Sequence, residues 1–487
     1  MHNRLNMRYL FLFFWIISSL IGNGSSKPDK KYYQEKYRPQ YHFTPEKNWM
    51  NDPNGLVYYG GEYHLFYQYN PNGTERGFMH WGHAISKDLV HWEHLPIAIT
   101  PDDNSTDKSR CTAYSGCAIV DENNTAGLQQ GSEKTLLIYY TSWECGQRLA
   151  YSTDKGRTWN KYAKNPLIPA ANDDARDPKV FYHKPSGNWI MVLYRKPDNV
   201  DANQGISIFT SKDLVTWELQ SHVVGFFECP DLIQLPLDGD KGKQKWVLLA
   251  GSGEYKVGSF DGKVFTPESA LKVLDHGKNF YATQTWSNHP AGKVVQLAWM
   301  RGGEYPEMPF NGQMTFPCEL SLRTTKSGIT LCKKPIEALS LLHEKGVVKK
   351  KKNIIPGLKG NILSGVSGGS IHIKAKINPS SSDGFGFLIR NGKKEIGTEI
   401  RYDTAKKMLE IMGSRALVEP KEGILELEIL IDRSSIEIFA NGGEVVFSTC
   451  FTPVENDEEL TFWTQGGEVM VEEMEAYELN SAWGGKK

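Results

Sequence analysis

Hydrophobic and polar positions alternate over short runs along most of the chain after residue 40. Two aromatic runs, residues 55–59 and 63–67, flank the pair Gly60-Gly61, which favours a β-hairpin. The chain is rich in aromatic residues, with 13 Trp, 22 Tyr and 21 Phe, and it holds 46 Gly and 24 Pro. This combination favours many short strands and tight turns over long helices. We therefore predict an all-β fold.

A repeated segment indicates how these strands are organised. The sequence Ser-Lys-Asp-Leu-Val-x-Trp at residues 86–92 returns at residues 211–217. A variant, Ser-x-Asp-x-Gly-x-Thr-Trp, occupies residues 152–159 and resembles the Asp-box hairpin found in several β-propellers. The tryptophans recur about every 60 residues, a spacing that suits one four-stranded blade with long loops.

Five segments are candidates for the start of a blade's innermost strand: residues 51–53, 114–116, 176–178, 228–230 and 281–283. We therefore predict a five-bladed β-propeller over residues 27–335. Asp52 and Asp177 stand at the same distance ahead of the repeat tryptophans Trp92 and Trp217. Because the innermost strands converge on the central channel, we expect Asp52, Asp177 and Glu228 to meet there.

The pattern changes after Pro335, and 487 residues are enough for two domains. Residues 336–342 predict a short helix, and the basic run Lys349–Lys352 follows it. We assign residues 336–359 as a linker with solvated lysines. From residue 360 to 487, short alternating strands such as residues 425–431 predict a C-terminal β-sandwich.

The N-terminal segment, residues 1–26, has the features of a secretory signal peptide. Arg4 and Arg8 precede the apolar run Tyr9–Ile21, and small residues follow it. The run is too short to span a bilayer comfortably, and no later apolar run is long enough. We expect a secreted, extracellular protein without membrane association after cleavage. Three glycosylation triplets fit this location and begin at Asn72, Asn104 and Asn123.

Charge and cysteine content exclude some classes of partner. The 56 basic and 57 acidic side chains give a net charge of −1, so nothing indicates a nucleic acid partner. No CxxC pair or Cys/His cluster resembles a zinc site, and we expect no metal and no cofactor. The seven cysteines are odd in number, so at least one is unpaired or pairs between chains. Disulfide pairing and oligomeric state stay open.

The three candidate acids admit several uses. Asp52 lies in an Asp-Pro-Asn-Gly turn, and a carboxylate held on a tight turn is rigidly aimed, as a nucleophile must be. Three clustered carboxylates can bind a divalent cation, form a structural ion-pair network or cleave a glycoside; no calcium-loop pattern is present. Glycoside hydrolysis needs one carboxylate ionised and one protonated. We expect Asn51, Asn54 and turn amides to keep Asp52 ionised.

The same segments carry a resemblance to a known family. Residues 49–55, 66–71, 176–178 and 228–231 resemble the signature segments of glycoside hydrolase family 32, the β-fructofuranosidases that include invertases, inulinases and levanases. The resemblance extends through residues 313–315 to residues 432–437, and so over nearly the whole mature chain. It implies a five-bladed propeller followed by a β-sandwich, in agreement with the repeats. It also implies sucrose or a small fructan as the substrate.

The resemblance further implies a role for each acid. Asp52 is the expected nucleophile, Glu228 the general acid/base and Asp177 the stabiliser of the transition state. Retention through a covalent intermediate needs the nucleophile and the acid/base carboxyls roughly 5–5.5 Å apart. Six residues are expected to bind substrate: Asn51, Gln68, Trp81, Tyr114, Ser115 and Arg176. Ordinary strand hydrogen bonding remains the alternative for Gln68 and Ser115, and a place in the core remains the alternative for Trp81 and Tyr114.

The chain departs from the family pattern where many members carry a tryptophan eight residues after the glutamine, because Arg76 stands there. Arginine is also frequent in the family where this chain has Cys318. The leading hypothesis is a secreted retaining β-fructofuranosidase acting on sucrose and short fructans. A fructosyltransferase on the same scaffold is the nearest alternative. A non-catalytic fructan-binding protein is a third reading, but it requires a lost acid, and all three acids are present.

Overall fold

A computed structural model describes residues 32–102, 110–171, 174–357, 361–389, 398–452 and 460–483. The predicted signal peptide, residues 1–26, lies outside these ranges, as does Asn104. Helices within them are three short 3-10 segments: η1 (Pro197–Asn199), η2 (Asp201–Asn203) and η3 (Glu337–Leu342). None of the helices in the described ranges has the length and apolar character to cross a membrane. The predicted all-β class is confirmed.

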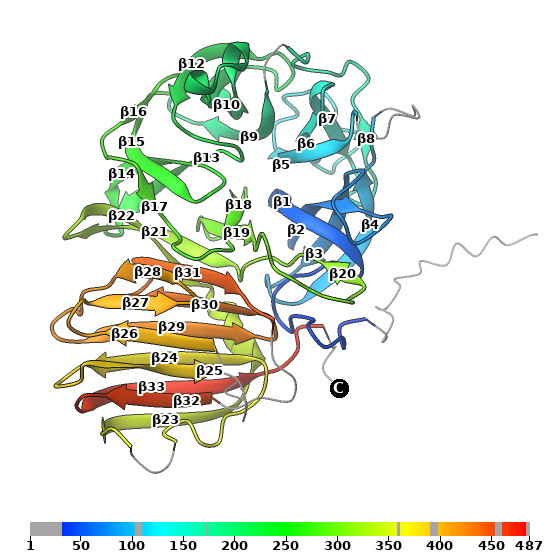
Figure 1. Cartoon of the computed structure of the whole chain (residues 1–487). Helices are drawn as coiled ribbons and strands as arrows, with labels where there is room; N and C mark the ends of the chain where they lie inside the picture. The colour runs from blue at the N-terminus through cyan, green and yellow to red at the C-terminus, as the bar shows by residue number, and fades with distance from the viewer. Residues whose placement is uncertain are drawn as a thin grey trace, which may run out of the picture.

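Antiparallel blades surround a central axis in the upper part of Figure 1. Blade 1 is β1 (Asn48–Tyr59), β2 (Glu62–Asn70), β3 (His80–Ser86) and β4 (Trp92–Ile99). Blade 2 is β5 (Ala113–Asp121), β6 (Thr135–Ser142), β7 (Gly146–Ser152) and β8 (Asn160–Lys161). Blade 3 is β9 (Arg176–His183), β10 (Asn188–Arg195), β11 (Gly205–Ser211) and β12 (Glu218–Val224).

Blades 4 and 5 belong to one continuous sheet, because β13 and β21 share a single parallel pair, Leu237 with Leu322. Blade 4 is β13 (Asp231–Leu237), β14 (Asp240–Leu249), β15 (Glu254–Phe260) and β16 (Phe265–Pro267), with β17 (Lys272–Val273) beside β15. Blade 5 is β18 (Tyr281–Thr285), β19 (Val295–Trp299), β21 (Cys318–Thr325) and β22 (Gly328–Pro335). The short β20 (Phe310–Asn311) pairs with β1.

Each blade shares a hydrophobic core with the next, which explains why the sheets stack into a ring. Phe66 of blade 1, for example, packs in one cluster with Ile138 of blade 2. Corresponding clusters join blades 2 and 3, 3 and 4, and 4 and 5. The ring closes where Leu65 of blade 1 packs in one cluster with Leu297 of β19 in blade 5 and with Trp286, which directly follows β18. The predicted five-bladed propeller is therefore confirmed.

The repeated segments form the same turn between the third and fourth strands of blades 1, 2 and 3. In blade 1, Asp88 Oδ1 accepts a hydrogen bond of 2.8 Å from the backbone N–H of His91. Asp154 and Asp213 accept equivalent backbone bonds in blades 2 and 3. A fourth such turn, at Asp261 in blade 4, lacks the tryptophan, so the repeat search did not find it.

The C-terminal domain is a β-sandwich, as predicted. One sheet has the order β23 (His343–Ile354), β33 (Val469–Leu479), β24 (Ile371–Asn378), β29 (Leu425–Asp432), β30 (Ser435–Ala440) and β31 (Val445–Cys450). The other has the order β28 (Ser414–Leu417), β27 (Met408–Ile411), β26 (Thr398–Asp403), β25 (Gly384–Ile389) and β32 (Leu460–Gln465). Alternate residues from both sheets, including Ile373 and Phe385, fill one core.

The assignment of residues 336–359 as a linker is wrong for most of its length. After η3 the chain enters β23, which pairs with β33 from His343 opposite Leu479 to Ile354 opposite Val469. The lysines Lys349–Lys352 lie on this edge strand and are mostly exposed. Lysines on an edge strand disfavour pairing with the edge of another sheet. The strand has few buried positions, so its sequence resembles that of a solvated linker.

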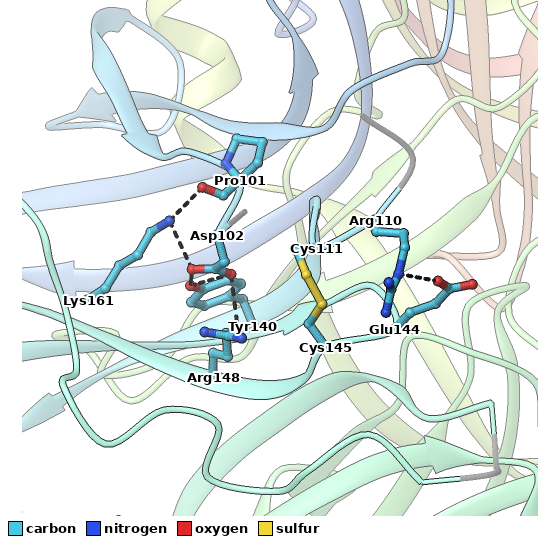
Figure 2. The surroundings of a disulfide bond; sticks show 9 residues. All are labelled: Pro101, Asp102, Arg110, Cys111, Tyr140, Glu144, Cys145, Arg148 and Lys161. Atoms are coloured by element: carbon cyan, nitrogen blue, oxygen red, sulfur yellow. Dashed lines mark hydrogen bonds and ion pairs between the residues drawn. A yellow bond between two sulfur atoms is a disulfide. The ribbon is translucent and has the colours of Figure 1, made fainter. Parts of the chain in front are cut away.

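One disulfide is present in the described part of the chain, between Cys111 and Cys145 in blade 2 (Figure 2). It joins the segment before β5 to the turn between β6 and β7. The other five cysteines are free: Cys117, Cys229, Cys318, Cys332 and Cys450. The pairing that the sequence left open is therefore a link within one blade.

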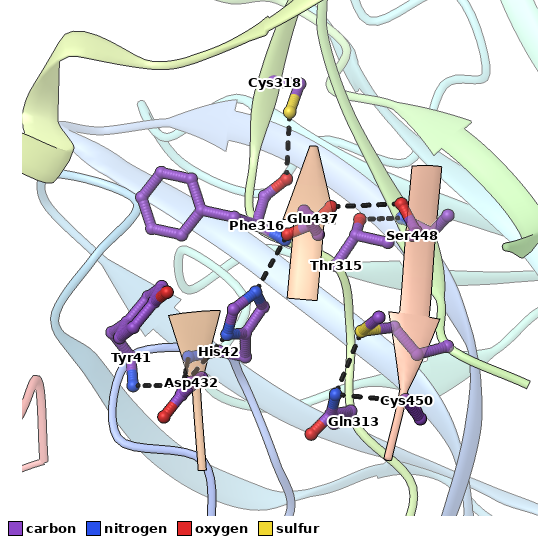
Figure 3. Close-up of polar contacts among 12 residues, drawn as sticks. Tyr41, His42, Gln313, Thr315, Phe316, Cys318, Asp432, Glu437, Ser448 and Cys450 are labelled. Atoms are coloured by element: carbon purple, nitrogen blue, oxygen red, sulfur yellow. Dashed lines mark hydrogen bonds and ion pairs between the residues drawn. The ribbon is translucent and has the colours of Figure 1, made fainter. Parts of the chain in front are cut away.

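Buried charges connect the propeller to the sandwich (Figure 3). The His42 ring lies between two carboxylates of the sandwich, with Nδ1 2.9 Å from Asp432 Oδ2 and Nε2 2.8 Å from Glu437 Oε2. All three side chains are fully buried. Burial alone lowers the pKa of His42, but the hydrogen bonds and charges of the two carboxylates outweigh it and raise this pKa to about 9. The segment at residues 432–437 therefore builds the domain interface.

Candidate active site

Three acids from different blades converge at one end of the central channel. Asp52 lies in β1, Asp177 in β9, and Glu228 just before β13. Cys229 links them: its thiol Sγ lies 3.8 Å from Asp52 Oδ2 and 3.5 Å from Asp177 Oδ2. Its backbone N–H also donates to Asp177 Oδ2 over 3.1 Å. The structure thus brings together the acids that the repeats placed at equivalent positions.

Asp52 is buried and held by three side-chain donors. Asn51 Nδ2 donates to Oδ1 over 3.1 Å. Gln68 Nε2 and Ser115 Oγ both donate to Oδ2, over 3.1 Å and 2.5 Å. Gln68 and Ser115 are also hydrogen-bonded to each other. This network fixes the carboxylate on the strand and leaves little freedom for its rotation.

Of the groups expected to keep Asp52 ionised, Asn51, Asn54 and the turn amides, only Asn51 donates to the carboxylate. Burial raises the pKa of Asp52 and the charge of Glu228 raises it further, while the hydrogen bonds from Ser115 and Asn51 act in the opposite direction. The Asn54 amide does not contact the carboxylate; oriented to satisfy its neighbours, it donates to Pro53 O and Ser115 Oγ. The turn predicted at residues 52–55 is also wrong, because these residues belong to β1, whose pairing with β2 shifts register on either side of Pro53 and Asn54.

Asp177 occupies a strained position that the surrounding strands hold in place. Its φ is 63°, in the left-handed region that non-glycine residues seldom adopt. Its N–H donates to Thr141 Oγ1 of blade 2 over 2.9 Å. Burial raises the pKa of this carboxyl to about 7, with Arg176 opposing the shift and the charges of Glu228 and Asp52 adding to it.

Glu228 is the most accessible of the three acids, with its side chain 22% exposed. Glu228 and Cys229 both have positive φ, 44° and 45°, a conformation that non-glycine residues seldom adopt. Arg176 Nε donates to Glu228 Oε2 over 3.0 Å, and the Tyr281 hydroxyl donates to Oε1 over 2.5 Å. The prediction of site residues missed Tyr281, although the repeats marked residues 281–283 as the start of a blade.

Arg176 connects Glu228 to the wall of the site. Its guanidinium forms an ion pair with Asp174 and lies over the rings of Tyr194 and Phe227, 4.5 Å and 5.4 Å from their centroids. These contacts fix the position of a cation beside both Asp177 and Glu228.

Two predicted aromatic wall residues have different positions. Trp81 is fully buried between blades 1 and 2, where its Nε1 donates to the carbonyl of Tyr114 over 2.9 Å. The prediction that Trp81 lines the site is wrong, because on β3 its side chain faces the neighbouring blade. Tyr114 is half-buried, and its hydroxyl accepts a bond of 3.3 Å from Arg76. Burial raises the pKa of this hydroxyl; the charge of Arg76 lowers it, and the charge of Glu228 raises it.

The arrangement has the chemistry of glycosidic bond cleavage. A fixed, buried carboxylate interacts electrostatically with a second, more open carboxyl group, and a cation and a hydroxyl hold the open one. No three His, Cys, Asp or Glu side chains are grouped as metal ligands in the ranges that the structure describes.

Comparison with known proteins extends over both domains. The family model for the glycosyl hydrolases family 32 N-terminal domain matches residues 42–335, and that for the family 32 C terminal matches residues 338–478. A levanase of Bacillus subtilis is 41% identical over 94% of this chain and 72% of its own length. An extracellular exo-inulinase of Aspergillus awamori is 32% identical over 93% of this chain and 96% of its own.

Solved structures agree. The crystal structure of exo-inulinase from Aspergillus awamori has a TM-score of 0.83 at 30% identity and covers 93% of this chain and 100% of its own. A fructofuranosidase variant from Schwanniomyces occidentalis, complexed with fructosylnystose, has a TM-score of 0.79 at 30% identity, over 92% of this chain and 98% of its own. The chain therefore belongs to glycoside hydrolase family 32 and is a glycoside hydrolase.

Proposed function

We propose that this chain is a secreted retaining β-fructofuranosidase that removes the terminal non-reducing β-fructofuranosyl unit from sucrose and short fructans. The observation that carries the proposal is the contrast between two acids. Asp52 is immobilised by Asn51, Gln68 and Ser115, whereas Glu228 is open to a ligand and held by a cation. The names of the related proteins, levanase and exo-inulinase, support fructans as the substrate class.

In the first step, Asp52 attacks the anomeric carbon of the fructosyl unit and Glu228 protonates the departing oxygen. The three donors to Asp52 keep its oxygen aligned with the carbon that it attacks. The bond to the leaving group breaks as the ester bond to Asp52 forms, so the leaving sugar departs neutral.

In the second step, Glu228 removes a proton from water, and the water displaces Asp52 from the anomeric carbon. Glu228 thus returns to its protonated form, and the released fructose keeps its original configuration. Arg176 and Tyr281 hold the Glu228 carboxyl through both steps. Asp177, whose pKa burial raises to about 7, accepts or donates hydrogen bonds with sugar hydroxyls as charge develops in the transition state.

Secretion is the second part of the proposal. Residues 1–26 have the charged, apolar and small-residue regions of a signal peptide. The related exo-inulinase is named as extracellular. The disulfide between Cys111 and Cys145 is also typical of oxidising compartments.

A product assay tests the proposal directly. The purified protein is incubated with sucrose, an inulin trisaccharide and a levan trisaccharide, and free and transferred fructose are measured separately. We expect free fructose from each substrate. Fructose found mainly in longer saccharides would make the chain a fructosyltransferase, and absence of any cleavage would overturn the proposal.

A further inference from the structure

Three side chains form a stack at the mouth of the active site, which we call the mouth stack: Arg76, Tyr114 and Trp143. The rings of Tyr114 and Trp143 are 4.8 Å apart and inclined by 17°. The Arg76 guanidinium lies 5.6 Å from the centroid of the Tyr114 ring and bonds to its hydroxyl. Trp143 is only partly buried and has no role in the chemistry proposed above.

The backbone around Trp143 is fixed on both sides. Its N–H donates to Thr112 O over 3.1 Å, and its carbonyl accepts from the N–H of Cys111 over 2.9 Å. The disulfide to Cys145 ties the same two segments together, with the two Cα atoms 5.3 Å apart. The ring is therefore held in place before any ligand arrives, which lowers the entropic cost of binding against it.

Trp143 also lines a groove of about 320 Å³ beside the mouth stack. The groove is lined by apolar residues that include Pro169 and Ala170 and by two carboxylates, Glu144 and Asp174, which are paired with Arg110 and Arg176. Its volume lies within the usual range of small-ligand sites. A surface that combines a flat indole, small apolar residues and carboxylate acceptors suits a sugar, whose C–H faces are apolar and whose hydroxyls donate.

A chain of contacts connects the groove to Glu228. Asp174 on its wall forms an ion pair with Arg176, and Arg176 Nε bonds to Glu228 Oε2. The general acid must reach the leaving-group oxygen, so the part of the substrate beyond the scissile bond extends past Glu228. Asp174, at the other end of this chain of contacts, lines the same groove as Trp143.

We propose that Trp143 and this groove bind the sugar residues of a fructan beyond the first leaving-group unit. The inference rests on the proposed function, because that function places the leaving group beside Glu228. The Trp143 indole packs against a sugar ring, while Glu144 and Asp174 accept hydrogen bonds from sugar hydroxyls. Sucrose, a disaccharide, is too short to fill the groove. Trp143 is thus a chain-length specificity residue.

The test compares Trp143→Ala and Trp143→Phe on sucrose and on an inulin tetrasaccharide. We expect Trp143→Ala to keep kcat/KM for sucrose within about twofold and to lower kcat/KM for the tetrasaccharide about tenfold, through KM. Trp143→Phe restores most of the loss because it keeps an aromatic face. Tyr182→Ala is the matched control: Tyr182 is an exposed aromatic (51%) on β9, six residues beyond Arg176 and away from the catalytic end of the channel, and both activities should be unchanged.

Equal losses on the two substrates, or an unchanged tetrasaccharide KM, would overturn the inference. A titration separates this outcome from failure of the proposed function. The Glu228→Gln protein, with and without Trp143→Ala, is titrated calorimetrically with sucrose and with the tetrasaccharide, and only the tetrasaccharide Kd should rise. If the wild-type chain cleaves no fructoside, the proposed function fails. The titration then decides alone whether the groove binds the saccharide, and an unchanged tetrasaccharide Kd overturns the inference.

Discussion

The Ser115 hydroxyl donates a hydrogen bond of 2.5 Å to Asp52 Oδ2, across the boundary between blades 2 and 1. The same oxygen accepts from Gln68, so side chains on β5 and β2 determine the orientation of a carboxylate on β1. Ser115 and Gln68 are both almost fully buried. The orientation of Asp52 therefore depends on the assembly of neighbouring blades and not on the local sequence of β1 alone.

Asp52→Asn should abolish turnover without unfolding the protein. Asparagine keeps the shape and most hydrogen bonds of the side chain but lacks the negative charge of a nucleophile. We expect a loss of ~10³-fold or more in kcat. The measurement is sucrose hydrolysis, with thermal unfolding as the control for folding. A purified variant that kept a tenth of wild-type activity would show that Asp52 is not the nucleophile.

Glu228→Gln should slow both steps of the reaction, but unequally across substrates. Substrates with good leaving groups need little protonation, so the first step recovers for them while the second stays slow. Pre-steady-state measurements on an activated aryl β-fructofuranoside and on sucrose give the two rates. Equal damage with both substrates would argue against the acid role of Glu228.

Arg76→Trp should shift chain-length preference toward inulin. Arg76 bonds to Tyr114 at the mouth, and its guanidinium is more strongly hydrated than an indole. A tryptophan favours extended apolar stacking along a fructan, so the ratio of inulin to sucrose kcat/KM should rise by a modest factor, because one such contact is worth ~1–2 kcal/mol. An unchanged ratio would mean that Arg76 serves only the protein surface.

The His42 interface should make stability pH-dependent in the alkaline range. Its folded-state pKa, about 9, lies above the unfolded value of about 6.5. The stabilisation is therefore complete below about pH 6.5 and is lost as pH rises through about 9. The pKa of Asp432 is lowered, because its hydrogen bonds to His42 and to backbone N–H groups outweigh the effect of burial. Its contribution to stability is therefore lost as pH falls through this lowered pKa.

His42→Gln should consequently lower Tm at pH 6 by a few degrees and flatten the fall in Tm between pH 7 and 10. It keeps hydrogen-bonding capacity but cannot balance the charges of Asp432 and Glu437. Thermal unfolding over a pH series supplies the measurement. A variant with the same pH dependence as the wild type would exclude His42 as the titrating group.

The repeats were sufficient to predict the ring and to bring Asp52 and Asp177 to equivalent positions. Trp81 was misplaced because an alternating pattern shows that two faces of a strand differ but does not show which neighbour each face meets. Tyr281 was missed because its partner, Glu228, belongs to the preceding blade. The disulfide could not be paired, since several pairings of seven cysteines remain possible without coordinates.

The lysines of β23 illustrate a different limit. Their sequence has the composition of a linker, and only pairing with β33, more than a hundred residues later, makes this segment a strand. Pairing between segments so distant in sequence depends on the completed sandwich, which local composition does not encode.

The most direct test of the central claim is the site of covalent attachment during turnover. Glu228→Gln protein is mixed with an activated aryl β-fructofuranoside, quenched in acid, digested and analysed by mass spectrometry. The account predicts one fructosyl group on the peptide that contains Asp52, and none when Asp52 is also replaced by asparagine. A fructosyl group on Asp177, or catalysis that releases fructose with inverted configuration and leaves no covalent adduct, would contradict it.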